Sequence, residues 1–369
     1  MKIMKWDYTS ITKSSNGYED VMDKLKSYKS FKCTNLSKEE QEKIIEEVFN
    51  IYRTKNIFPI TYYNEEGIIE EIKKCCEKEV FFDKVLDLKF NQGQSLCRFF
   101  FPNMACVECA GDKRTPYNKF YDDHNLKRAI EFCLKHKTSN SPCVPSAIKD
   151  GLEMLGGGVA TNFKTMKAKA IYEKYCPPNG IIYDFSCGFG GRLLGALSSK
   201  NNYRYFGCEP CVETYTHLNE LGYYIEKATN TQNRFKIICK GSEDYRTHKN
   251  YVDFAFSSPP YFNLEKYSDE DTQCYNKFKT LDEWFNGYVR PTIQNIHYML
   301  KPDRYYAVNI ADFNVGKNTV SFVDKWIELS LNIGFNFVEE IPMSLQTRRG
   351  EGHGSNTTKK LEGIYVFRK

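Results

Sequence analysis

A hydroxyl, a proline carbonyl and an aromatic ring follow one another in Ser258-Pro259-Pro260-Tyr261. The apolar, aromatic-rich run 251–257 before them is typical of a buried strand. Two consecutive prolines cannot continue a β-ladder, so the backbone leaves the sheet in an extended shape. Because ligands bind at the carboxyl edge of strands in α/β sheets, the motif predicts oxygen acceptors and an aromatic face presented to a ligand. A plain proline-rich loop is the alternative interpretation.

A second motif lies upstream, where the short apolar strand predicted at 180–184 ends in Asp184 and runs into a glycine-dense turn. Gly188 and Gly190 lie in this turn, and a helix-like apolar pattern follows Arg192. Glycines permit tight turns and close approach of the backbone to a ligand, while a helix start supplies free N–H groups. By itself such a turn suits a dinucleotide site or a structural turn equally well.

Two further predicted strands end in acidic residues. The strand at 205–209 ends in Glu209, about 20 residues after the glycine turn, where a carboxylate can accept ribose hydroxyls. The strand at 235–239 leads into a polar turn that contains Ser242 and Glu243. These followers favour a cofactor site over a structural turn.

In this order of motifs the chain resembles the S-adenosylmethionine-dependent amino methyltransferases that act on DNA, over roughly residues 160–369. One departure is Ser186, which stands where the family commonly has phenylalanine, although the two glycines remain. The continuation at 190–195 looks like variants from phages and mobile elements. The resemblance implies an α/β fold with a doubly wound, seven-stranded Rossmann-like sheet, mostly parallel, whose last strand inserts antiparallel. It also implies S-adenosyl-L-methionine as cofactor.

The resemblance further implies a catalytic role for Ser258, Pro259, Pro260 and Tyr261. The Ser258 hydroxyl and the Pro259 carbonyl would accept the two hydrogens of an exocyclic amino group on a flipped-out adenine or cytosine. Tyr261 would stack on that base, assisted by Phe262. A serine before Pro-Pro-Tyr is frequent among cytosine-amino enzymes, but the base stays open.

The cofactor-binding residues that the resemblance implies are Asn162, Phe163, Asp184, Gly188, Gly190, Glu209, Ser242 and Glu243. Asp184 would order the turn or approach the amino-acid end of the cofactor, Glu209 would bind the ribose, and Ser242 and Glu243 would lie near the adenine. Asn162 and Phe163 look like the segment that supports the methionine end. A simple capped helix is the alternative for that segment.

Arg348 and Arg349 lie in a glycine-rich basic segment near the end of the chain. Such a segment is either a loop that contacts DNA phosphates or a polar solvated loop. Phosphate contacts would set affinity and salt dependence without choosing a base sequence.

The pattern predicts a mainly helical region at 1–155, with a DNA-contacting or supporting role, and a catalytic domain at 156–369. Ser37 and Glu40 predict a capping box at the start of a helix. For 98–103 a core strand is the favoured interpretation, and a wall that contacts a nucleotide is the alternative.

Composition favours an intracellular enzyme, and the resemblance to phage and mobile-element enzymes implies the cytoplasm of a bacterium or of a virus-infected host. The net charge of +5 excludes a chain that is basic throughout, so a nucleic-acid-binding face must be local. No apolar run has the length of a membrane helix. The 14 cysteines are expected to be reduced, and Cys106 and Cys109 lack a second pair for a zinc site.

The predicted partner is DNA, with RNA as a second candidate and no membrane, and the sequence leaves the oligomeric state, recognition sequence and any restriction partner open. Two other functions remain at this stage. One is the same amino methylation on RNA or on a protein glutamine. The other is a DNA-binding protein that keeps the fold without turnover.

Overall fold

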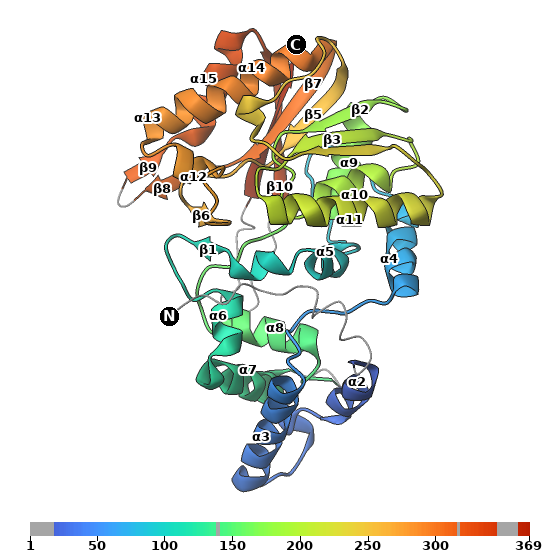
Figure 1. Cartoon of the computed structure of the whole chain (residues 1–369), viewed down its shortest axis with the longest axis vertical. Coiled ribbons are helices and arrows are strands. Elements are labelled where there is room, and N and C mark those ends of the chain that lie inside the picture. Colours follow the sequence, from blue (N-terminus) through green and yellow to red (C-terminus); the bar gives the residue numbers. More distant parts are fainter. Residues whose placement is uncertain (1–17, 138–140, 316–317, 345–360) are drawn as a thin grey trace. The chain divides into compact units, whose positions relative to one another are not determined.

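The computed structural model describes residues 18–137, 141–315, 318–344 and 361–369, and the chain divides into two compact units (Figure 1). The first unit comprises Met1–Asn64 and Pro102–Ala160, and the second comprises Glu65–Phe101 and Thr161–Lys369. The predicted single boundary at 155/156 differs from this division because residues 65–101 belong to the unit that contains the large sheet.

The described part of the first unit is mainly helical. Its elements are α2 (Tyr18–Ser27), η2 (Phe31–Cys33), α3 (Lys38–Thr54), η3 (Pro102–Cys106), β1 (Glu108–Cys109), α6 (Pro116–Tyr121), α7 (Asp123–His136) and α8 (Pro145–Met154).

The predicted capping box stabilises the start of α3. The Ser37 hydroxyl accepts from the Glu40 backbone N–H at 3.2 Å, and the Glu40 carboxylate accepts from the Ser37 N–H at 2.7 Å. This prediction is therefore confirmed. The helix then buries Val48 and Tyr52 in a core with Leu126 of α7 and Ile148 of α8. Packing of these apolar faces stabilises the unit, since most of the stability of a helix in a protein comes from tertiary packing of its apolar face.

The second unit is built on a seven-stranded sheet of order β10-β11-β7-β5-β2-β3-β4. The strands are β2 (Ile181–Asp184), β3 (Arg204–Cys208), β4 (Phe235–Ile238), β5 (Val252–Ser257), β7 (Leu300–Ile310), β10 (Asn336–Ser344) and β11 (Leu361–Arg368). All neighbouring pairs are parallel except those of β11, which runs antiparallel to both β10 and β7. The predicted fold class, including the antiparallel last strand, is confirmed.

Helices cover both faces of this sheet. Those of the second unit are α4 (Glu65–Glu77), α5 (Gln94–Phe100), α9 (Thr165–Tyr175), α10 (Gly191–Leu197), α11 (Val212–Thr229), η4 (Ser242–Asp244), α12 (Cys274–Lys277), α13 (Leu281–Trp284), the π-helical η5 (Phe285–Val289), α14 (Arg290–Met299) and α15 (Phe322–Ile333). Figure 1 shows α9, α10 and α11 on one face and α14 and α15 on the other. Three short strands complete the unit: β6 (Glu265–Lys266), β8 (Phe313–Val315) and β9 (Asn318–Val320).

Side-chain alternation along the central strands builds a core on each face. Phe254 and Phe256 of β5 pack edge-on against Tyr172 of α9, with ring centroids 6.1 and 5.9 Å apart. On the opposite face Tyr183 of β2 belongs to a cluster with Trp326 of α15. Each aromatic side chain buried in this way contributes about 1.5–3 kcal/mol, so both helical layers hold the central strands in place.

The strand predicted at 98–103 is wrong. Residues Gln94–Phe100 form helix α5, and Phe100 and Phe101 are buried within the second unit. Phe100 packs against Tyr224 of α11, with ring centroids 5.6 Å apart. The aromatic run indicated burial correctly, but it did not distinguish a helix from a strand, because burial here comes from tertiary contacts.

All 14 cysteines are free thiols. Within the described ranges no helix combines the length and apolar character that crossing a membrane requires. In the same part of the chain no three His, Cys, Asp or Glu side chains lie close enough together to hold a metal ion.

Candidate active site

The carboxyl ends of β2 and β5 form the point at which the direction of winding reverses. From β2 the chain proceeds outward through β3 and β4, and it then returns to β5 on the other side of β2 (Figure 1). Ligands of open α/β sheets bind in the crevice at such a switch point. The glycine turn follows β2 and the Ser-Pro-Pro-Tyr motif follows β5, so the fold brings the two predicted motifs to this position.

Ser257, the last residue of β5, links the two strand ends directly. Its hydroxyl lies 2.7 Å from Asp184 Oδ1 and 3.2 Å from the backbone carbonyl of Ser186. The start of the Ser-Pro-Pro-Tyr motif is thereby held at a fixed distance from the glycine turn. Sequence analysis missed this residue, although a polar residue at the end of an apolar strand was a usable signal.

Asp184 is fully buried and its carboxylate is occupied by protein groups. It accepts from Arg192 Nε at 2.7 Å, from Tyr205 Oη at 2.7 Å and from the Ser186 N–H at 3.1 Å, in addition to Ser257. Of the two predicted roles, these contacts favour the ordering of the turn over contact with a cofactor. They connect β2, β3, β5 and α10 through one carboxylate.

Arg192 is a second residue for which the sequence alone predicted no role in the site. Its side chain is buried, forms an ion pair with Asp184 and also donates to the Ser186 carbonyl. Burial alone lowers the pKa of a guanidinium, but the Asp184 carboxylate outweighs this and raises the pKa of Arg192. An aspartate that ends a buried strand needs a cationic partner, and Arg192 is the nearest cation after it in the sequence.

The glycine turn has the backbone conformation that its sequence predicts. Gly188 and Gly190 adopt φ values of +56° and +74°, which other residues rarely adopt. A Cβ on Gly190 would lie 2.6 Å from the Phe101 ring and 2.7 Å from Leu221. Conformation and close packing therefore both require glycine at this position.

Glu209 lies directly after β3 and contacts the glycine turn. One carboxylate oxygen accepts from the Gly188 N–H at 3.0 Å and the other accepts from the Cys211 N–H at 3.0 Å. Burial raises the pKa of Glu209 to about 7, against the opposing effect of these two hydrogen bonds. Its charge therefore changes close to neutral pH.

Asn162 and Phe163 contact both halves of the site. The Asn162 amide donates to the Phe189 carbonyl in the glycine turn at 2.9 Å. The Phe163 ring packs edge-on against Phe256 of β5, with centroids 5.3 Å apart. The structure therefore places this predicted pair beside the switch point.

The motif after β5 presents a free hydroxyl and a fixed aromatic ring. Ser258 is half-buried, and within the described ranges its hydroxyl has no protein partner. Pro259 is buried and Pro260 is half-buried. The Tyr261 hydroxyl donates to Glu362 at 3.0 Å and accepts from the Ala311 N–H at 2.9 Å. Burial, with the adjacent Glu362, raises the pKa of Tyr261 well above its usual value, so this phenol stays neutral.

Three predicted residues lie differently from the expectation. Phe262 has a positive φ of 39°, and its ring is 6% exposed and packs against Trp284 in the core. The Ser242 hydroxyl is buried against Thr292 of α14 at 2.9 Å. Glu243 forms an ion pair with Lys277. These side chains contact the protein where ligand contacts were expected, while Arg348 and Arg349 lie outside the described residues.

No family model and no curated protein matches the chain. Solved structures that match include a TehB-like SAM-dependent methyltransferase from Corynebacterium glutamicum, at 14% identity and a TM-score of 0.36, covering 59% of this chain and 92% of that one. The [4+2]-cyclase SpnF matches at 12% identity and a TM-score of 0.39, covering 57% and 84%. Geranyl diphosphate C-methyltransferase from Streptomyces coelicolor matches at 11% identity and a TM-score of 0.36, covering 53% of this chain and 74% of that one. Similarity at this level carries no argument about activity, and the fold assignment rests on strand order and direction.

Proposed function

We propose that this chain is an S-adenosylmethionine-dependent methyltransferase that methylates the exocyclic amino nitrogen of adenine or cytosine in DNA. The observation that carries the proposal is the junction at the switch point. There the glycine turn and the Ser-Pro-Pro-Tyr motif meet, and the Ser257 hydroxyl joins them through Asp184 and Ser186. The proposed sites for the methyl donor and the amino acceptor would therefore be neighbours at this edge of the sheet.

The residues beside β2 fit the proposed cofactor. Each Glu209 oxygen accepts one backbone N–H and keeps a lone pair that can accept from a ribose hydroxyl. Gly188 carries no side chain that would obstruct a ligand lying across the turn, and Asn162 and Phe163 border the same turn. When bound, the cofactor supplies an electrophilic methyl group on a sulfonium ion.

The residues after β5 suit an amino acceptor. The lone pair of an exocyclic amino nitrogen conjugates with the ring, so the enzyme must draw this nitrogen toward tetrahedral geometry. The Ser258 hydroxyl and the Pro259 carbonyl can accept its two hydrogens. Because positive charge develops on nitrogen, these acceptors bind the transition state more strongly than the ground state, and each contributes about 2–4 kcal/mol.

Tyr261 provides the surface on which the base would rest. Its hydroxyl is held by two hydrogen bonds, so the orientation of the ring is fixed before a base arrives. Extruding a base from a duplex costs a few kcal/mol, and stacking on an aromatic ring offsets about 1–3 kcal/mol of it. The phenol is neutral, so the site gains no further negative charge from it.

The direct test is expression in a host that lacks DNA methylation, followed by modification-aware sequencing of its DNA. N6-methyladenine or N4-methylcytosine at a defined motif is the expected result. Ser258→Ala should remove it, whereas Ser321→Ala, at an exposed serine that makes no capping hydrogen bond, should not.

Incubation with cofactor that carries a labelled methyl group distinguishes the proposed function from the two alternatives. Label in RNA or in a protein glutamine, with none in DNA, would overturn the DNA substrate. Cofactor binding without transfer to any of the three would instead indicate a DNA-binding protein that has lost turnover.

A further inference from the structure

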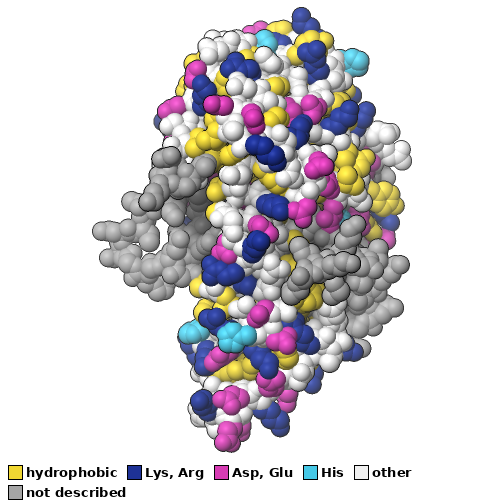
Figure 2. Space-filling view, turned by 60° about the vertical axis from the view of Figure 1, so that its left-hand side comes forward, with side chains coloured by type: hydrophobic (Ala, Val, Ile, Leu, Met, Phe, Trp, Pro, Cys, Tyr) yellow, Lys and Arg dark blue, Asp and Glu magenta, His cyan; other side chains and the backbone are white. Residues whose placement is uncertain are grey.

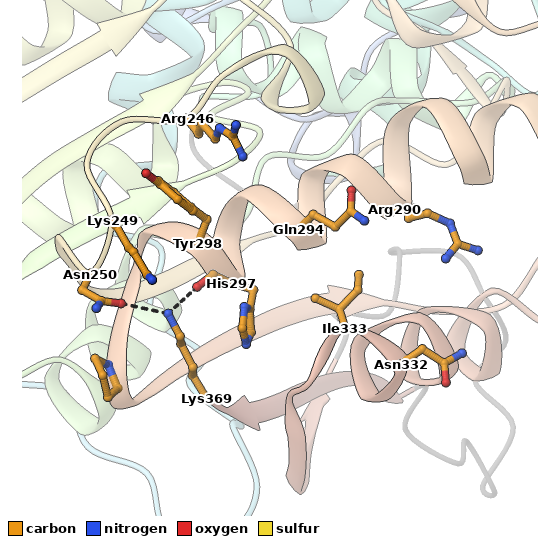
Figure 3. A pocket seen from close by; sticks show the side chains of 11 residues that line it. Arg246, Lys249, Asn250, Arg290, Gln294, His297, Tyr298, Asn332, Ile333 and Lys369 are labelled. Carbon is orange, nitrogen blue, oxygen red and sulfur yellow. Dashed lines mark hydrogen bonds between the residues drawn. The ribbon is translucent and has the colours of Figure 1, made fainter.

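A pocket of about 710 Å³ lies at the edge of the sheet opposite the switch point. Its lining comes from the segment before β5, the outer face of α14, the end of α15 and the residue after β11 (Figure 3). The β5 strand separates this edge from the Ser-Pro-Pro-Tyr motif, a span of about 16 Å at 3.3 Å per residue. The pocket is therefore distinct from the candidate active site.

The charged side chains that line this pocket are all basic. Arg246, Lys249, Arg290 and Lys369 line it together with His297, and no aspartate or glutamate occurs among the described lining residues. Basic and acidic side chains are interspersed over the face shown in Figure 2.

Neutral groups hold these cations in place without neutralising them. Lys369 Nζ donates to Asn250 Oδ1 at 3.0 Å and to the carbonyls of His297 and Leu300, both at 2.6 Å (Figure 3). The Arg246 guanidinium lies 4.8 Å from the centroid of the Tyr298 ring. Burial and the nearby Lys249 lower the pKa of Lys369, as expected where cations face one another. Such a surface attracts anions.

The arrangement of the donors favours an extended polyanion over a single phosphate. Arg290, Gln294, His297 and Tyr298 follow one face of α14, as the i, i+4, i+7 and i+8 spacing requires. Eight residues of helix span about 12 Å, which is the axial rise of roughly three to four phosphates in a nucleic-acid strand. Amide side chains and the partly exposed Tyr298 ring lie between the charges, where they can contact sugars.

We propose that this pocket is a second nucleic-acid contact that binds the phosphates of a strand extending from the target base. That the strand is nucleic acid rests on the proposed function, whereas the inference that the pocket binds an anion rests on its own lining residues. Contacts of this kind set the affinity and the register of the protein on its substrate without reading its sequence.

The test measures binding of a fluorescent DNA duplex of about 30 base pairs at several salt concentrations. The pocket variant combines Arg246→Gln, Lys249→Gln and Arg290→Gln. Its control combines Lys84→Gln, Lys89→Gln and Lys236→Gln, which remove equal charge at exposed lysines for which no ion pair is found. The logarithm of the affinity falls linearly with the logarithm of the salt concentration, and each lost phosphate contact reduces the magnitude of this slope by about 0.9. We expect the magnitude of the slope to decrease by about 2–3 in the pocket variant and to change little in the control.

Equal slopes and affinities in the two variants would overturn the proposal. The proposal would also be overturned if the pocket variant lost binding of tripolyphosphate but kept that of DNA, because the pocket would then serve a small anion. This measurement of DNA binding does not depend on methyl transfer. If the protein binds DNA through the pocket but transfers no methyl group, this inference stands and the proposed function fails. If it methylates DNA but the two variants have equal slopes, the proposed function stands and this inference fails.

Discussion

The ring and the hydroxyl of Tyr261 have different proposed roles, and the ring also packs edge-on against Phe313 and Phe322, with centroids 5.5 Å apart in each case. Its ring is the proposed platform for the base, while its hydroxyl contacts only the protein, through Glu362 and Ala311. Tyr261→Ala should lower turnover about 5- to 150-fold, since stacking contributes about 1–3 kcal/mol. Cofactor affinity should stay nearly unchanged in calorimetric titrations.

Tyr261→Phe is the matched control. It keeps the ring and should keep most of the activity, while the unpaired Ala311 N–H lowers the free energy of unfolding by about 1–3 kcal/mol. Lost cofactor binding in the alanine variant would mean that donor and acceptor sites are assigned the wrong way round.

Glu209 should make cofactor binding depend on pH. Because burial raises its pKa to about 7, the carboxyl is largely protonated at pH 6 and largely ionised at pH 8. The ionised form accepts ribose hydroxyls better, so affinity should rise from pH 6 to pH 8.

Glu209→Gln is the control, because it keeps the shape of the side chain but removes the ionisable carboxyl. Any pH dependence that comes from ionisation of the cofactor itself stays the same in this variant. The difference in pH dependence between wild type and this variant isolates the carboxyl, and it is measured by titration at pH 6, 7 and 8. Parallel pH dependences for the two proteins would exclude Glu209 from the cofactor site.

At the scale of elements, the Asp184–Arg192 pair holds four of them together. Removing one partner of a buried ion pair leaves an uncompensated charge, which costs about 3–5 kcal/mol. Arg192→Met should therefore lower the free energy of unfolding by about that amount in urea titrations.

The double variant Asp184→Asn/Arg192→Met supplies the control, because it removes both charges and should recover part of the loss. If the two variants were equally destabilised, packing of the Arg192 side chain, and not its charge, would account for the effect.

The sequence predicted elements well where local pattern and tertiary environment agree. The strands predicted at 180–184, 205–209, 235–239 and 251–257 and the capping box of α3 follow from runs of apolar residues bounded by polar or turn-forming residues. The prediction failed at 98–103, where aromatic residues favoured a strand, but Gln94–Phe100 form a helix that contacts α11 and the glycine turn.

Within the candidate site, the sequence indicated which segments meet but not where each side chain points. Ser242 and Phe262 occupy predicted positions, yet contacts with Thr292 and Trp284 direct them into the protein. Such orientations depend on residues 22 to 50 positions away in the chain, which no local pattern reports.

At the scale of the whole molecule, the unit of the large sheet is discontinuous in sequence. Residues 65–101 pack within it: a Cβ on Gly93 would lie 2.7 Å from Leu194, and Lys169 Nζ donates to the carbonyls of Cys75, Cys76 and Lys78. The chain from residue 161 onward therefore lacks part of its own core.

A fragment of residues 161–369 alone should fail to unfold cooperatively on heating, whereas 65–101 joined to it by a short flexible linker should do so. The linker can be short, because Phe101 and Phe163 both lie against the glycine turn. Circular dichroism on heating distinguishes the two fragments. Cooperative unfolding of the shorter one would show that residues 65–101 are dispensable.

The most direct test of the central claim is a crystal structure with S-adenosylhomocysteine, the product of the proposed cofactor. The account predicts the ribose at Glu209, the amino-acid end beside Asn162 and the sulfur facing Pro259. A product molecule bound elsewhere, or one whose sulfur is shielded from the Ser258-Pro259-Pro260-Tyr261 motif, would contradict it.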